Sequence, residues 1–98
     1  MGKYKLSTEA QNSLHSMKTY SDKTFGKQRT KAYLQNIRKR MQALADNPLL
    51  GIVREDLNVG YHSDFVGSHT IYYRIYSTHI GIISILHQSM DPSKYVVK

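Results

Sequence analysis

Five histidines are the residues of this chain best suited to acid–base or metal chemistry: His15, His62, His69, His79 and His87. No two lie four residues apart, which is the spacing that places two metal ligands on one face of a helix. Cysteine is absent, so the sequence offers neither a thiolate ligand nor a cysteine nucleophile. Glycine-rich loops of the kind that cradle phosphates are also absent. We therefore expect no metal, no cofactor and no small-molecule substrate.

His87 follows the apolar run 80–86 and precedes Gln88 and Ser89. An imidazole titrates near neutral pH, so His87 could act as a general base or contact a partner. It could instead be a strand-end histidine that bonds to the backbone. The sequence fixes no carboxylate or nucleophile beside it, which favours this structural interpretation.

Arg74 lies within a segment rich in tyrosine and β-branched residues. Alternation along a strand places Tyr73 on the core face, and Tyr72 and Tyr76 on the other face with Arg74. An arginine among exposed tyrosines could meet an acidic partner or stack on the bases of a single-stranded nucleic acid. Burial of these tyrosines in the core is the alternative.

The chain has 98 residues and a net charge of +7, and the charge is unevenly distributed. Residues 1–50 carry ten basic and three acidic side chains, whereas residues 51–98 carry four of each. This asymmetry favours an acidic partner, either nucleic acid or protein, although a solvated basic helix face would look the same. The basic N-terminus lacks a following apolar segment, and no apolar run approaches the length of a membrane helix. We expect a cytoplasmic protein with no membrane contact.

Two helices are expected in the N-terminal half. The first begins after a capping Ser7 or Thr8 and ends near Phe25-Gly26, where glycine supplies a left-handed cap. The second covers about residues 27–46, and its apolar residues recur at i, i+3, i+7 and i+10. This stripe comprises Leu34, Ile37, Met41 and Leu44. The tight turn between the helices predicts an antiparallel hairpin.

The remaining segments are strand-like. Strands are expected at residues 4–6, 61–66, 69–76 and 80–86, and the last is apolar on both faces, which is typical of an interior strand. Helices followed by a run of strands predict a two-layer α+β fold. We expect the helical hairpin to pack on a curved antiparallel sheet, with residues 4–6 joining that sheet at an edge or in its centre.

Several segments together resemble ParE toxins of the RelE/ParE superfamily. They are Tyr4 to Ala10, Leu44 to Gly51, Arg54 to Leu57 with Gly60-Tyr61, Gly67 to Arg74, and Ile82 to Asp91. The resemblance covers nearly the whole chain and implies one toxin domain over residues 1–98. It also implies a type II toxin that inhibits DNA gyrase by binding the enzyme with its bound DNA. A ParD-like antitoxin would silence this toxin.

RelE-like members of the superfamily instead cut messenger RNA on the ribosome, using Lys and Arg side chains on the sheet and a tyrosine near the C-terminus. The matching positions here are His62, Asp64, Thr70, Ser89 and Tyr95. An acidic residue repels the phosphate, and one tyrosine cannot carry the reaction. The resemblance therefore favours a gyrase inhibitor that is not an enzyme. A ribosome-dependent endoribonuclease remains one alternative. A degenerate toxin is another, since Ser84 stands where ParE toxins often have arginine.

Candidate contact residues fall into two sets. Those for the target are Arg54, His62, Arg74, His87, Lys94, Tyr95 and Lys98. Those for the antitoxin are Leu34, Ile37, Arg38, Lys39, Met41, Leu44, Tyr72 and Arg74. The tail after Asp91-Pro92 shows no periodic apolar pattern, so we expect it to serve the target and not the core. Packing of Val96 and Val97 against the sheet is the alternative.

Overall fold

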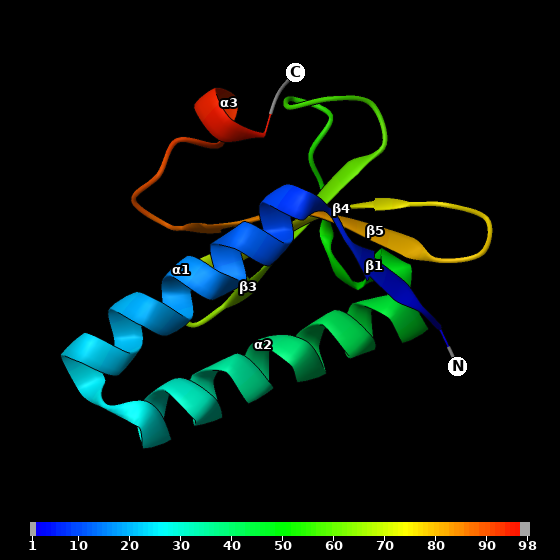
Figure 1. Cartoon of the computed structure of the whole chain (residues 1–98). Coiled ribbons are helices and arrows are strands. Elements are labelled where there is room, and N and C mark those ends of the chain that lie inside the picture. Colours follow the sequence, from blue (N-terminus) through cyan, green and yellow to red (C-terminus); the bar gives the residue numbers. More distant parts are fainter. Residues whose placement is uncertain (1, 97–98) are drawn as a thin grey trace.

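The chain forms a two-layer α+β structure, which a computed structural model describes for residues 2–96. A helical hairpin packs on one face of a five-stranded sheet (Figure 1). The helical elements are α1 (Thr8–Phe25), α2 (Lys27–Asp46), the 3-10 turn η1 (Pro48–Leu50) and α3 (Pro92–Tyr95). The strands are β1 (Tyr4–Leu6), β2 (Ile52–Val53), β3 (Tyr61–Val66), β4 (His69–Ile75) and β5 (Ile80–His87). The predicted order of strand, two helices and then strands is confirmed.

The strand order in the sheet is β1-β5-β4-β3-β2. Strands β3, β4 and β5 pair antiparallel, as predicted, and β5 is an interior strand. The short strand β2, which was not expected, pairs antiparallel with β3. β1 joins at the edge and runs parallel to β5, so the complete sheet is mixed. The backbone pairs of β1 place Lys5 beside Gly81.

Local sequence sets the limits of both helices. The Ser7 hydroxyl accepts a hydrogen bond from the Ala10 N–H at 3.0 Å, which satisfies one of the free donors in the first turn of α1. Gly26 separates the helices with a φ of 90°, a value that disfavours any residue with a Cβ. Asn47 ends α2, because the following Pro48 cannot continue the helix.

The main core lies between the hairpin and the sheet. The predicted stripe of α2 is buried there, with Ile37, Met41 and Leu44 at 0% exposure. Burial of each such side chain contributes roughly 1.5–3 kcal/mol to folding. On the sheet, Tyr73 is fully buried as predicted, and its hydroxyl donates to the Pro48 carbonyl at 2.7 Å. The hairpin stripe and the sheet therefore cover each other.

A second, smaller core lies on the other face of the sheet, which we call the outer face. It comprises the buried side chains of Leu57, Tyr61, Tyr72, Leu86 and Val96. The segment 54–60 and the end of α3 supply its cover. No helix within residues 2–96 is long and apolar enough to cross a membrane.

This outer core corrects two expectations. Tyr72 was expected at the surface beside Arg74, but it is 4% exposed because Leu57 and Val96 pack in the same cluster. The tail was expected to be free of the core, but Val96 is 1% exposed. The chain after Pro92 is thus anchored to the sheet by an apolar contact that its sequence does not signal through periodicity.

Candidate functional site

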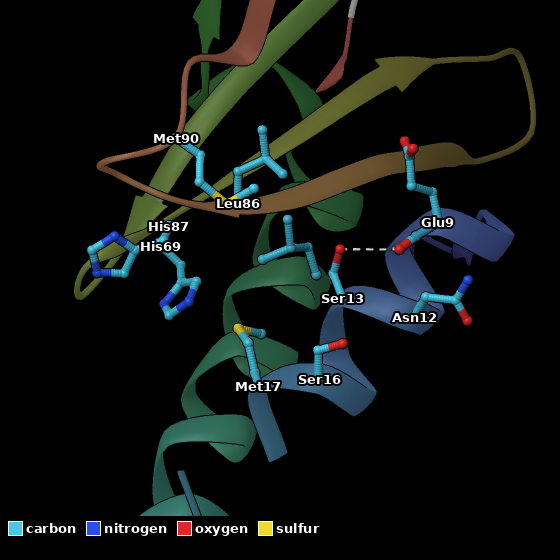
Figure 2. A pocket seen from close by; sticks show the side chains of 10 residues that line it. Glu9, Asn12, Ser13, Ser16, Met17, His69, Leu86, His87 and Met90 are labelled. Atoms are coloured by element: carbon cyan, nitrogen blue, oxygen red, sulfur yellow. Dashed lines mark hydrogen bonds between the residues drawn. The ribbon is translucent and has the colours of Figure 1, made fainter. Parts of the chain in front are cut away.

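An apolar pocket opens between α1, the start of α2 and one end of the β4–β5 ladder. Its volume is about 690 Å³, and an adjoining cavity of about 300 Å³ shares five of its residues. Those shared residues are Ser16, Met17, His69, His87 and Met90. Figure 2 shows Met17 on α1 and the two histidines on the sheet lining the smaller cavity. We call the two cavities together the hairpin pocket.

Aromatic side chains of the hairpin form the outer wall of this pocket. Tyr20 and Phe25 on α1 are 67% and 55% exposed, and Arg29 on α2 adds a cation to the lining. The tip of the hairpin projects past the ends of the strands (Figure 1), so the sheet does not cover these rings. Large apolar side chains that gather at an open cavity are typical of an interaction site.

Tyr33 of α2 holds the sheet end of the pocket. Its hydroxyl donates to the Val66 carbonyl at 3.0 Å, accepts from the Ser68 N–H at 3.3 Å and lies 2.6 Å from Nδ1 of His69. The turn between β3 and β4 contains Gly67 with a φ of 57°, and a Cβ there would lie 2.8 Å from the Tyr33 ring. Glycine therefore allows both the turn and the close approach of the tyrosine.

His69 and His87 are directly opposite each other on β4 and β5. Burial lowers the pKa of His69, and the neighbouring His87 lowers that pKa further. His87 accepts a hydrogen bond at Nδ1 from the Ser89 N–H at 3.1 Å, as the structural interpretation of this strand-end histidine predicted. Among residues 2–96, no group of three or more His, Asp or Glu side chains is arranged to hold a metal ion.

The three candidate target residues on the main body do not form one site. His62 is 9% exposed and its ring stacks on Tyr73 at 5.4 Å, on the helical face of the sheet. Arg54 forms a two-point ion pair with Asp56, with nitrogen–oxygen distances of 3.0 Å. Arg74 is exposed on the outer face. Burial thus removes His62 as a contact residue in the folded chain.

The candidates near the C-terminus are placed on or next to α3. Lys94 and Tyr95 are exposed, with Tyr95 at 45%. Lys98 lies outside the described residues. His87 lines the hairpin pocket and does not face the outer face. It therefore does not share a surface with Arg74.

The candidate antitoxin residues divide by burial. Leu34, Ile37, Met41, Leu44 and Tyr72 have at most 7% exposure, so they offer a partner no surface while the fold is intact. Arg38 and Lys39 are exposed on α2 and stay available, as does Arg74. The helical stripe was assigned to a partner from its apolar character, but the sheet of the same chain covers it.

The positions that match RelE-like catalytic residues do not converge on a cationic site. Asp64 forms an ion pair with Arg40, whose pKa this hydrogen bond raises. Thr70 is 5% exposed, and Ser89 lies at the pocket end of β5, bonded to His87. Arg40 is therefore engaged by a carboxylate and is not free to stabilise a phosphate.

The pocket residues Tyr20, Phe25, Tyr33 and Met90 were missed as site candidates. Tyr20 and Phe25 lie in the part of α1 that continues past the end of the sheet, and no pattern within the helix marks that point. The register between β4 and β5 places His69 and Met90 in the same pocket as residues of α1, and this register cannot be read from either strand alone. A count of residues outward from the turn at Ser77-Thr78 could have placed His69 near the end of β5.

Comparisons with known proteins bear on the whole chain. A family model for the ParE toxin of the type II toxin–antitoxin system parDE matches residues 4–92. The chain is 33% identical over 91 residues to Toxin ParE1 of Caulobacter vibrioides, covering 93% of this chain and 94% of that protein. It is 30% identical over 90 residues to Toxin ParE1 of Mycobacterium tuberculosis, covering 91% of this chain and 92% of that protein.

Two solved structures share the fold. A chain of the chromosomal ParDE system from P. aeruginosa superposes with a TM-score of 0.76 at 17% identity, over 89% of this chain and 96% of that chain. A chain of the toxin–antitoxin complex RelBE2 from Mycobacterium tuberculosis gives a TM-score of 0.54 at 21% identity, over 88% of this chain and 96% of that chain.

Proposed function

We propose that this chain, which belongs to the ParE toxin family of type II toxin–antitoxin systems, inhibits DNA gyrase and is held inactive by a ParD-like antitoxin. The toxin would act by binding, without cofactor or metal. Two features of the chain support the proposal: an open apolar pocket for the antitoxin, and the lack of a cationic site at the positions that RelE-like toxins use for catalysis.

The hairpin pocket is the observation that carries the antitoxin half of the proposal. It leaves Tyr20 and Phe25 more than half exposed beside a cavity of about 690 Å³. Residues 1–50, which include the hairpin and β1, carry the whole of the net positive charge. The complementary partner is an acidic amphipathic segment whose apolar side chains enter the pocket while its carboxylates meet Arg29 and the exposed cations of α2. An antitoxin of ParD type is proposed because the P. aeruginosa relative of the same fold is named as part of a ParDE system.

The family and the side chains found at the positions that match RelE-like catalytic residues support the gyrase half of the proposal. Cleavage of RNA needs cations placed where negative charge develops on the phosphate. At the matching positions, Asp64 is acidic and His62 and Thr70 are buried. This arrangement supports inhibition by binding over cleavage of messenger RNA.

Growth assays with the intact chain test the proposal. Induction of the chain alone should arrest growth and induce the response to DNA breaks, while ribosome-bound messages stay intact in primer-extension assays. Co-expression of its antitoxin should restore growth. Message cleavage that begins before DNA breaks appear would contradict the gyrase target, and arrest that persists with the antitoxin would contradict the partner. Normal growth after induction of the intact chain would indicate a degenerate toxin and overturn the proposal.

A further inference from the structure

A cationic and aromatic surface lies on the outer face of the sheet, at the end remote from the hairpin pocket. The strand pairing aligns Arg74 of β4, Gly81 of β5 and Lys5 of β1 in one row. Arg74 and Lys5 are both exposed. Because the backbones of neighbouring strands are about 4.8 Å apart, the two cations are anchored roughly 10 Å from each other. Glycine between them leaves the row flat.

Tyr76 and His79 extend this row at the turn between β4 and β5. Their rings stack with centroids 5.0 Å apart and planes at 21°, and Tyr76 is 49% exposed. The backbone holds the pair in place, since the Tyr76 N–H donates to the His79 carbonyl at 2.8 Å. A Cβ at Gly81 would lie 2.8 Å from the Tyr76 ring, so glycine at this position lets the ring lie against the sheet.

Arg74 completes the surface from the other side. Its guanidinium lies 6.0 Å from the centre of the Tyr76 ring, and its side chain passes over Gly60, where a Cβ would be 3.4 Å from Nε. Gly60 has a φ of 82°, which favours glycine independently. The long side chain of Arg74 is thereby held along the sheet next to the aromatic stack. We call Lys5, Arg74, Tyr76 and His79 the platform.

The strands that carry the platform contain no carboxylate. β1, β4 and β5 contain no acidic residue. Asp64 of β3 belongs to the helical face, where it pairs with Arg40, and Asp56 pairs with Arg54. The outer core reaches this row at Tyr61, which pairs with Arg74 and belongs to the buried cluster. Beyond that point Arg74, Lys5 and Tyr76 are exposed. The platform therefore stays open and positively charged.

We propose that the platform binds single-stranded nucleic acid, with a base stacked on the Tyr76–His79 pair and backbone phosphates on Arg74 and Lys5. Exposed aromatic rings flanked by cations bind single strands because every unpaired base offers a flat face and every nucleotide a phosphate. A paired duplex hides its base faces and would meet only the cations. An acidic protein segment would likewise pair with the cations, and the Tyr76 ring would not contribute to its binding. Binding here requires neither gyrase nor ribosome, so it can be measured on the chain alone.

Fluorescence anisotropy with a labelled oligothymidine strand tests the platform. Tyr76→Ala should weaken binding about tenfold, while Tyr76→Phe should stay within about twofold of the parent, since stacking needs the ring and not the hydroxyl. Arg74→Ala and Lys5→Ala should each lower the slope of log affinity against log salt by about 0.7. Lys31→Ala removes the same charge from an exposed position of α2 and should have less than about a twofold effect. Thermal melting confirms that each variant is folded.

Three results would overturn the inference. One is undetectable binding at low ionic strength by the folded parent chain. Another is an equal loss of affinity in Lys31→Ala and Arg74→Ala, which would indicate attraction to the general positive charge of the chain. The third is displacement of the oligonucleotide by a polyglutamate peptide whose own binding needs Arg74 but is unaffected by Tyr76→Ala, which would assign the surface to an acidic protein.

Discussion

His69 and His87 face each other across the β4–β5 ladder, with ring centroids 5.3 Å apart and ring planes at 89°. Their pairing depends on an irregularity in the ladder. Tyr73 pairs with Ile82, but Tyr72 pairs with Ser84, so β5 contains one extra residue at that point. Without this bulge His69 would lie opposite Leu86, and His87 would point to the other face. A single inserted residue thus places two imidazoles in one pocket.

Acid should destabilise the fold through His69. Burial and His87 lower the pKa of His69 below its ordinary value of 6.5, so the unfolded chain binds the proton first as the pH falls. The stability that neutral His69 provides is complete above about pH 6.5 and is lost as the pH falls from there through the lowered pKa. Urea unfolding at pH 7.5 and pH 5 should therefore show a smaller loss in His69→Gln than in the parent.

His15→Gln serves as the control for that comparison, because His15 is exposed on α1. Carboxylates contribute to the pH dependence equally in all three chains. An identical loss of stability in His69→Gln and His15→Gln would contradict the assigned role of burial at His69.

The Val96 side chain should be a stabilising contact. It is 1% exposed in the outer core, so Val96→Ala should lower the free energy of unfolding by about 2 kcal/mol. Tyr95→Ala, at a side chain that is 45% exposed, should change it by less than about 0.5 kcal/mol. Urea denaturation of both variants measures the difference. Equal effects would mean that the end of α3 is not packed as described.

Periodic patterns in the sequence predicted the features of this fold that are set by residues close together in the chain. The stripe of α2, the cap at Ser7 and the strand alternation around Tyr73 are each set within one element, and each was predicted correctly. Tyr72 was wrongly placed at the surface because the chain that covers it lies more than ten residues away on either side. The contact of Val96 was left as an alternative for the same reason. The pairing of His69 with His87 was missed because the bulge in β5 changes the register, and no local pattern marks an inserted residue.

Truncation of the pocket aromatics should impair antitoxin binding without affecting the fold. Tyr20→Ala and Phe25→Ala remove rings that are more than half exposed, so thermal stability should be nearly unchanged. Each should weaken antitoxin affinity at least tenfold if these rings are central contacts, as calorimetric titration can show. Leu49→Ala is the matched control, since Leu49 is 78% exposed but does not line the pocket. Comparable losses in all three variants would contradict the location of the site.

Charge reversal on α2 should slow the association of the antitoxin. Arg38→Glu with Lys39→Glu changes two exposed cations, whereas Arg40 must be kept because it pairs with Asp64. Stopped-flow measurements at low salt should show a slower association rate and a weaker salt dependence, with a smaller change in dissociation. An association rate equal to that of the parent at low salt would contradict electrostatic steering by the hairpin.

The supercoiling activity of purified gyrase on relaxed plasmid tests the central claim most directly. With ATP present, increasing amounts of the intact chain should inhibit supercoiling and accumulate cleaved plasmid, and an equimolar amount of its antitoxin should restore supercoiling. The Tyr20→Ala, Phe25→Ala double variant should inhibit gyrase equally well but resist the antitoxin. Complete supercoiling in the presence of excess folded chain, with no cleaved plasmid, would contradict the account.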